Sequence, residues 1–214
     1  MPDRHWDFEH LHLDIKVDVD GGSLSGTATH KVHPIGLRAG WLRLHQVGLD
    51  IQSVTVDGTS VEGWKVGHES IDIPMPQSGD THEIAVTYAA APQTGLHFRG
   101  GKGTSDPGRE VWSQGEGQDN RYWFPGWDYP NDKFTVSTDL TVKTGYAAFA
   151  NGPLIGSNEA EEGWTTWSYS LERPIVNYLV AIAAGEYALY KEEGAVPLEY
   201  VTSRAVDESG ARHT

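Results

Sequence analysis

The chain of 214 residues contains no cysteine. That absence excludes disulfide bonds, iron–sulfur clusters, thiolate zinc sites and a cysteine nucleophile. A chain of this length can bury roughly 70% of the surface that its unfolded form exposes, so it can fold without a disulfide or a metal. The compartment stays open: we expect a soluble protein, either cytoplasmic or, if a signal peptide has been removed, bacterial periplasmic or secreted.

Basic residues are scarce as well. The chain has 16 Lys and Arg residues against 30 Asp and Glu residues, which gives a formal net charge of −14. Such a field repels phosphate backbones and anionic lipid, so nucleic acid is not an expected partner. It favours cationic ligands such as the free amino end of a peptide, although net charge also simply keeps a β protein soluble.

Long apolar runs and helical periods are missing too. The longest apolar run covers residues 178–184. That is the length of a strand and far short of the ~20 residues of a membrane span. The first residues lack the apolar core of a signal peptide. No segment keeps a helical hydrophobic period between helix caps.

Strand patterns fill most of the chain. From 10 to 20, Leu11, Leu13 and Ile15 begin an apolar face that alternates with His and Asp residues, which is typical of a half-buried strand. A turn at 20–22 leads into a returning strand at 24–32, so we expect a hairpin. Further short strands are expected at 41–47, 51–56, 61–66, 71–73, 83–88, 134–142, 147–150, 164–171, 177–183 and 198–202. The pattern predicts an all-β fold, sandwich-like or otherwise built of several sheets.

One stretch, 95–133, does not show this pattern of short strands. It is rich in glycine and polar residues and also carries Tyr122, Trp123 and Phe124. Long irregular segments inside a compact domain are usually functional or disordered. The aromatic residues argue against disorder, so we expect an ordered functional segment.

Zinc-protease motifs are begun but not completed. Two His-Glu pairs, at His68 and His82, start like H-E-x-x-H, but Asp72 and Val86 stand where the second His belongs. Both pairs also lie in strand-like sequence, where this spacing would place the ligands on different faces. We interpret them as solvated surface residues.

Two further histidine pairs, His10-x-His12 and His30-x-x-His33, have no evident third ligand. The first pair shares a strand face, which suits either a metal or the polar side of an exposed strand. The chain has no G-x-S-x-G elbow for a serine nucleophile. No metal site and no catalytic residue are therefore predicted within this chain.

The most specific signal lies inside the irregular stretch. Ser113-Gln114-Gly115-Glu116 is followed, after four residues, by R-x-x-F-P-G-x-D-x-P-x-x-K from Arg121 to Lys133. This order resembles the first domain of the gluzincin aminopeptidases, the family of aminopeptidase N and leukotriene hydrolase. Their signature reads T-Q-x-[QE], four residues, then R-x-x-F-P-C-x-D-x-P-x-x-K. Only Ser113 for Thr and Gly126 for Cys depart from it.

The resemblance covers nearly the whole chain and implies a fold and a context. The family's first domain is a saddle-like, multi-sheet β body that packs on a separate catalytic domain. That second domain supplies H-E-x-x-H, a later Glu and G-x-M-E-N, none of which occurs here. We therefore expect 1–203 to be the N-terminal β domain of a zinc aminopeptidase. By the same resemblance, 204–214 start a linker to an absent catalytic domain that binds the zinc, and the fragment alone is expected to be inactive.

The resemblance also implies site residues. The T-Q-x-[QE] loop helps to bind the first residue of the substrate, which assigns this role to Gln114 and Glu116. A peptide α-amine with a pKa near ~8 is largely cationic at neutral pH, so a carboxylate can pair with it. Such a charge-assisted contact is roughly twice as strong as a neutral one. Residue chemistry alone would leave both side chains as ordinary polar groups of a loop.

Five residues of the longer motif are expected to support this loop through ion pairs and turns rather than to touch substrate. They are Arg121, Pro125, Asp128, Pro130 and Lys133. The neighbouring aromatic residues, including Trp127, are expected to belong to the core.

Three functions remain open at this level. The first is the aminopeptidase domain, with its own catalytic domain and peptides with a free N-terminus as partners. The second is a non-catalytic relative that uses the same β domain as a protein-interaction scaffold. The third is a carbohydrate-binding β-sandwich, which exposed Trp and acidic loops would suit. Glu116 favours the first, because a scaffold needs no amine anchor.

Overall fold

The computed structural model describes residues 3–36, 40–100, 105 and 108–203. Within them the chain forms strands and two short 3-10 helices, so the all-β, multi-sheet prediction is confirmed. The expected linker at 204–214 lies outside the described residues. The elements are β1 (Trp6–Asp18), β2 (Ser23–Pro34), β3 (Trp41–His45), β4 (Asp50–Val56), β5 (Thr59–Ser60), β6 (Lys65–Val66), β7 (Ser70–Pro74), β8 (His82–Ala90), β9 (Leu96–Gly100), β10 (Arg109–Ser113), η1 (Asn120–Tyr122), β11 (Phe134–Lys143), β12 (Ala147–Ala150), β13 (Leu154–Glu161), β14 (Trp164–Ile175), η2 (Asn177–Leu179), β15 (Ile182–Gly185), β16 (Tyr187–Glu192) and β17 (Leu198–Ser203).

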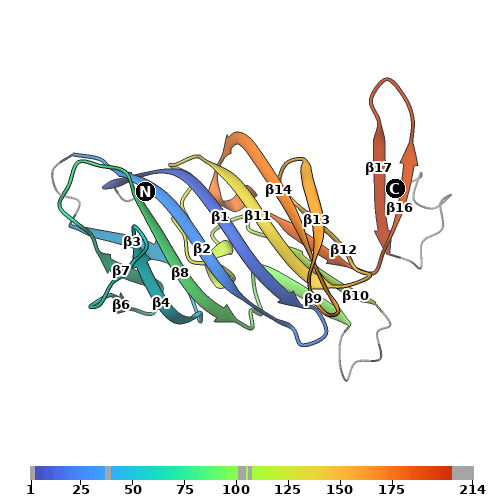
Figure 1. The fold of residues 1–214 in the computed structure, drawn as a ribbon, viewed down its shortest axis with the longest axis horizontal. Helices are drawn as coiled ribbons and strands as arrows, with labels where there is room; N and C mark the ends of the chain where they lie inside the picture. Colours follow the sequence, from blue (N-terminus) through green and yellow to red (C-terminus); the bar gives the residue numbers. More distant parts are fainter. Residues whose placement is uncertain (1–2, 37–39, 101–104, 106–107, 204–214) are drawn as a thin grey trace.

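One large sheet forms the body of the molecule (Figure 1). Its strand order is β13-β14-β11-β1-β2-β8-β4-β5. The pair β1–β11 is parallel, whereas the other pairs in this sheet are antiparallel. The predicted alternation in β1 is confirmed, because Leu11, Leu13 and Ile15 are fully buried while the polar residues between them face outward. A register shift between Phe8 and His10 keeps Phe8 on the core side as well.

Two small sheets lie at the two ends of the large one in Figure 1. The three-stranded sheet has the order β3-β7-β6, and the four-stranded sheet has the order β12-β15-β10-β9. Their apolar residues join those of the large sheet in one core cluster. The hairpin β16–β17 pairs only with itself and stands apart from the body. The segment 114–133 joins the three-stranded sheet at the bridge between Gly126 and His45 of β3, and it joins the large sheet where His30 of β2 bonds the Pro125 carbonyl.

Several expectations were wrong. Residues 61–66 do not form one strand, because β5 ends at Ser60 and β6 covers only Lys65–Val66. His82 is not a solvated surface residue: it is buried, and its Nδ1 lies 2.7 Å from a carboxylate oxygen of Asp57. Residues 177–183 do not form one strand, because η2 comes first and β15 begins only at Ile182. The stretch 95–133 is not irregular throughout, since it contains β9 and β10. Strand β13 was missed because every one of its residues is exposed, so its sequence carries no alternation of apolar and polar side chains.

The two histidine pairs differ in how the structure places them. His10 and His12 lie on the outer face of the large sheet, where both rings contact the Ser137 hydroxyl, at 3.0 and 2.8 Å. His30 points into the core and is buried, whereas His33 is exposed. Among the described residues, no group of three His, Asp or Glu side chains could hold a metal ion. Within the same residues, no helix is long and apolar enough for a membrane span.

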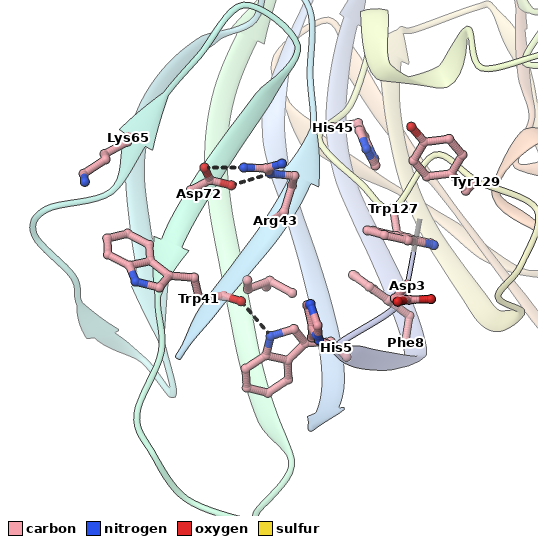
Figure 2. Close-up of a pocket in the computed structure, with 12 residues that line it drawn as sticks. Asp3, His5, Phe8, Trp41, Arg43, His45, Lys65, Asp72, Trp127 and Tyr129 are labelled. Atoms are coloured by element: carbon pink, nitrogen blue, oxygen red, sulfur yellow. Dashed lines mark hydrogen bonds and ion pairs between the residues drawn. The ribbon is translucent and has the colours of Figure 1, made fainter. Parts of the chain in front are cut away.

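A cleft of about 670 Å³ opens between β3 and the start of β1 (Figure 2). Trp127 and Tyr129 line one side of it, and Trp41 lines the other. The residues that line it do not include Gln114 or Glu116.

Burial fixes the charge state of His30. Its Nε2 donates to the Pro125 carbonyl oxygen at 2.8 Å, while its Nδ1 is buried without a partner among the described residues. Burial lowers the pKa of His30 to about 4, because a second proton would place a charge in the apolar core. The neutral ring therefore joins β2 to the segment around Pro125.

Acidification should destabilise the fold through this residue. Since the pKa of His30 is about 4 when folded and about 6.5 when unfolded, its contribution is fully present above pH 6.5 and is lost as the pH falls towards 4. At pH 4 the free energy of unfolding should be lower by about 3 kcal/mol. This follows from the difference between the two pKa values at about 1.36 kcal/mol per pH unit, less a small amount because His30 is itself half-protonated in the folded state at that pH. Urea unfolding at pH 7.5 and 4.5 measures it. The His30→Gln variant, which cannot titrate, should show a smaller difference between the two pH values, and an unchanged difference would contradict the assignment.

Candidate functional site

The loop that carries Gln114 and Glu116 begins where β10 ends. Its first residue, Ser113, is held to β15 by the Ile182 N–H, which donates to the Ser113 hydroxyl at 2.9 Å. The Gln114 N–H donates to the Gly95 carbonyl oxygen at 2.8 Å. Both site side chains are exposed, and neither makes a hydrogen bond with any described residue. The backbone of the loop is thus fixed while its two functional groups face outward.

Gly115 allows this arrangement by lying against a buried side chain. A Cβ atom at Gly115 would lie 2.4 Å from Oδ1 of Asn120, which is far inside van der Waals contact. Gly115 is buried, whereas the residues on either side of it are exposed. The close approach of Gly115 therefore holds the loop down at its centre and turns Gln114 and Glu116 outward.

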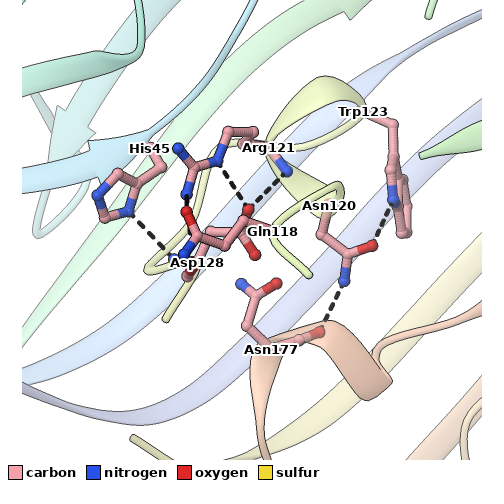
Figure 3. A network of polar contacts seen from close by, with 7 residues as sticks. All are labelled: His45, Gln118, Asn120, Arg121, Trp123, Asp128 and Asn177. Carbon is pink, nitrogen blue, oxygen red and sulfur yellow. Dashed lines mark hydrogen bonds and ion pairs between the residues drawn. The ribbon is translucent and has the colours of Figure 1, made fainter. Parts of the chain in front are cut away.

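Asn120, against which Gly115 packs, is fully buried. Figure 3 shows its polar contacts. Its Nδ2 donates to the carbonyl oxygens of Asn177 at 2.6 Å and Val180 at 3.2 Å. Its Oδ1 accepts from the indole Nε1 of Trp123 at 2.8 Å. The side chain uses its donors and acceptor to join the loop, η2 and the aromatic core, so it fixes the position of the loop.

A buried ion pair closes the other side of the loop (Figure 3). Nε of Arg121 donates to Oδ2 of Asp128 at 2.9 Å, and its Nη2 donates to Oε1 of Gln118 at 2.6 Å. Burial raises the pKa of the Asp128 carboxyl, while Arg121 acts in the opposite direction. Because Gln118 is two residues beyond Glu116, the guanidinium fixes the far end of the turn.

His45 connects this pair to the three-stranded sheet. Its Nδ1 accepts a hydrogen bond from the Asp128 N–H at 3.1 Å. Burial, together with the nearby Arg121, lowers the pKa of His45 to about 4, so the ring is neutral at pH 7. With Nδ1 acting as acceptor, the ring proton sits on Nε2.

The other predicted support residues play unequal parts. Pro125 is buried and offers its carbonyl to the core, whereas Pro130 is exposed in a turn. The Lys133 side chain is exposed and joins no ion pair within the described part of the chain. Its neighbour Asp132 holds the strand instead, accepting the Phe8 N–H at 2.9 Å. Of the expected core aromatics, Trp123, Phe124 and Trp127 are buried. Tyr122, which was expected in the core as well, is only partly buried and is not part of the core cluster.

Four residues of this network were not anticipated from the sequence: Gln118, Asn120, His45 and Asn177. Asn and Gln are common in loops, so nothing in the residue type marks a buried role. Asn177 was assigned to a strand, and His45 lies about 80 positions from Asp128. The one signal in the sequence was the glycine between Gln114 and Glu116, which indicates a close approach to something.

The arrangement can bind a cation through one outward carboxylate beside one amide, both on a fixed backbone. Within the described part of the chain, no cluster of metal ligands lies around it.

Comparison with known proteins places the chain in a family. A model of the peptidase M1 N-terminal domain matches residues 5–179. The chain is 23% identical over 207 residues to aminopeptidase N of Acetobacter pasteurianus, covering 92% of this chain and 58% of that protein. It is 26% identical to a leukotriene A-4 hydrolase homolog of Botryotinia fuckeliana, covering 86% of this chain and 31% of that one. The chain thus spans well under two thirds of either relative.

Solved structures share the fold. An M1 zinc metallopeptidase from Deinococcus radiodurans superposes with a TM-score of 0.80 at 20% identity, covering 96% of this chain and 49% of that one. Native leukotriene A4 hydrolase from Saccharomyces cerevisiae superposes with a TM-score of 0.76 at 19% identity, covering 91% of this chain and 31% of that one.

The contact between Gly115 and Asn120 can be tested by a double-mutant cycle. Gly115→Ala should destabilise the fold by about 1–3 kcal/mol, because its Cβ would overlap the buried amide. Asn120→Ala should also destabilise, since it leaves two backbone carbonyls without a donor. The double variant should cost less than the sum, because the smaller side chain at 120 makes room for the new methyl group.

Urea unfolding of the four proteins provides the measurement, and Gly156→Ala is the matched control. Gly156 lies in exposed β13, and a Cβ atom added there would have no neighbour within 4 Å, so its substitution should change little. Additive effects of the first two substitutions would show that Gly115 and Asn120 do not constrain each other.

Proposed function

The chain belongs to the peptidase M1 N-terminal domain family, and from that premise we propose that it is the N-terminal domain of a zinc-dependent aminopeptidase. In this proposal residues 1–203 form the domain and 204–214, outside the described residues, start a linker to the catalytic domain. In this proposal the zinc ion is bound by that catalytic domain. The catalytic domain and peptides with a free N-terminus are the partners.

The observation that carries the proposal is the exposed carboxylate of Glu116 on a fixed backbone. The Gly95 carbonyl holds Gln114 at one end of the loop, and Arg121 holds Gln118 at the other end. A carboxylate that need not reorganise on binding gives a stronger and more directional contact to an ammonium group. Gln114 supplies an adjacent amide for the same substrate residue.

This geometry also suits exopeptidase specificity. An anchor for the α-amine favours substrates whose chain begins at that point, because an internal peptide bond offers no positive charge to Glu116. The overall charge of −14 acts in the same direction at longer range, since it attracts cationic ligands. Both effects weaken as salt is added.

Substitution of Glu116 in the full-length enzyme tests the anchor. Glu116→Ala should raise KM for free-amine substrates about ten- to a hundredfold, the equivalent of one charge-assisted hydrogen bond. Glu116→Gln keeps a neutral hydrogen-bond acceptor, so its KM should lie between that of the unaltered enzyme and that of Glu116→Ala. Zinc content should be unchanged in both variants. Glu162→Ala removes an exposed carboxylate from the β13–β14 turn and serves as the matched control. An unchanged KM with Glu116→Ala would refute the anchor.

A second test concerns the isolated chain. We expect no zinc-dependent turnover of amino-acyl arylamides by the 214 residues alone, because the proposed zinc-binding residues lie in the catalytic domain. A chromogenic assay with added zinc, repeated with a chelator, measures this. Turnover that the chelator abolishes and that follows the protein through purification would show that the chain holds a complete site.

A further inference from the structure

The cleft beside β3 is bounded by the backbone edge of that strand. Trp41, Leu42 and Arg43 all line it, although side chains of successive strand residues point to opposite faces. Consecutive residues can share one cleft only where the cleft opens on the edge of the strand. Strand β3 is an edge strand of its sheet, with β7 on its other side.

Backbone pairing shows which groups of β3 face the cleft. The Gln46 N–H bonds the Glu69 carbonyl in line with β7, so Gln46, Leu44 and Leu42 direct their backbone groups towards β7. The intervening residues direct theirs away from β7. His45 follows this rule, because it exchanges two hydrogen bonds with Gly126, at 2.7 and 3.0 Å, on the side opposite β7.

Arg43 is the open position in this row. By the same alternation its N–H and C=O face the cleft, and within the described part of the chain neither has a partner. On one side of Arg43, the Trp41 carbonyl accepts the Trp6 indole N–H at 2.9 Å. On the other side, the backbone groups of His45 are hydrogen-bonded to Gly126. The donor–acceptor pair of Arg43 thus lies open between the Trp41 carbonyl and His45, both of which have partners.

Aromatic rings flank this open pair (Figure 2). Trp41, which is 48% exposed, lies on one side. Trp127 and Tyr129 lie on the other, packed around His45 with ring centroids 5.2 and 4.7 Å from it. An apolar side chain placed opposite Arg43 would lie in a cleft that has aromatic rings at both ends.

The charges that line the cleft are balanced. The Arg43 guanidinium binds Asp72 with two hydrogen bonds, at 2.7 and 2.8 Å, and is therefore already neutralised. Lys65 lies over the Trp41 ring at 5.1 Å, and Asp3 contributes one further carboxylate. The cleft thus has no excess charge for an ionic ligand, and it offers a neutral donor–acceptor pair between apolar walls.

We propose that this cleft binds a short extended peptide segment, whose backbone pairs with the N–H and C=O of Arg43 and whose apolar side chain lies between Trp41 and Tyr129. Adding a peptide to a free strand edge is a common mode of recognition, in which the backbone gives affinity and a side-chain pocket gives selectivity. Gly126 occupies the next position along the edge, so the bound segment is limited to about three residues before it must turn away.

The site is separate from the amine anchor and needs no free N-terminus. A capped tripeptide, N-acetyl-Gly-Phe-Gly-amide, therefore tests it without engaging Glu116. Titration into the isotope-labelled 214-residue chain should shift the amide signal of Arg43 and the indole signal of Trp41. We expect a dissociation constant on the order of 1 mM, because one backbone pair and one ring contact must offset the entropy lost on association.

A matched ligand separates backbone pairing from simple ring contact. The same tripeptide methylated at the Phe nitrogen keeps the ring but loses the N–H that would donate to the Arg43 carbonyl. It should bind at least about tenfold more weakly, the equivalent of one lost hydrogen bond. Equal binding of the two peptides, or shifts that leave the Arg43 amide unmoved, would overturn the proposal. So would tighter binding of an oligosaccharide at the same residues.

Two tryptophan variants complete the test. Trp41→Ala removes an exposed ring but keeps the backbone carbonyl that Trp6 uses, so the fold should survive. It should weaken binding of the unmethylated peptide about tenfold. Trp112→Ala removes a ring of similar exposure, 40%, from β10 and should leave affinity unchanged. Equal loss in both variants would mean nonspecific contact with exposed rings and would overturn the proposal.

Discussion

The buried pair of Arg121 and Asp128 is the constraint on which the site depends. The side chains of the pair are only 9% and 2% exposed, and one guanidinium reaches both the carboxylate and Gln118. A buried ion pair adds little net stability, because desolvation offsets attraction. Its value here is geometric: the turn after Glu116, the segment 125–129 and, through His45, the three-stranded sheet meet at one point. Removing one partner would leave an unpaired charge in the core. We therefore expect such a change to disturb the turn, the segment 125–129 and the contact with the three-stranded sheet together.

The fold could be predicted from the sequence wherever one face of a strand is buried. Leu11, Leu13 and Ile15 alternate with polar residues, and their pattern identified β1 correctly. The same reasoning failed for β13, which is exposed throughout, and for η2, whose apolar residues resemble those of a strand. Strands β9 and β10 were hidden because glycine and polar residues dominate the sequence around them. Periodicity reports burial, so elements without a buried face leave no trace in it.

The candidate site could be predicted from the sequence only in part. Gln114 and Glu116 were located through a resemblance, since an exposed Gln or Glu has no distinguishing chemistry in a sequence. Asn120 and His45 could not be found this way, because their roles depend on contacts with Asn177 and Asp128, which are distant along the chain. Such pairs come together only when the sheets are assembled. The glycine at 115 indicated that the backbone packs closely against another group, but the sequence did not indicate that this group is Asn120.

The parallel pairing of β1 with β11 has a consequence for synthesis of the chain. Strand β1 can form its hairpin with β2 as soon as both have left the ribosome, and β8 can then join on the far side of β2. Its other edge must wait for β11, about 125 residues later, as the pair His10 and Thr135 illustrates. Until then the centre of the future sheet is a temporary edge, with unpaired backbone groups above a row of Leu and Ile side chains. The Asp, Glu and Lys residues of β1 place charge beside that edge during the interval in which mispairing with another chain is possible.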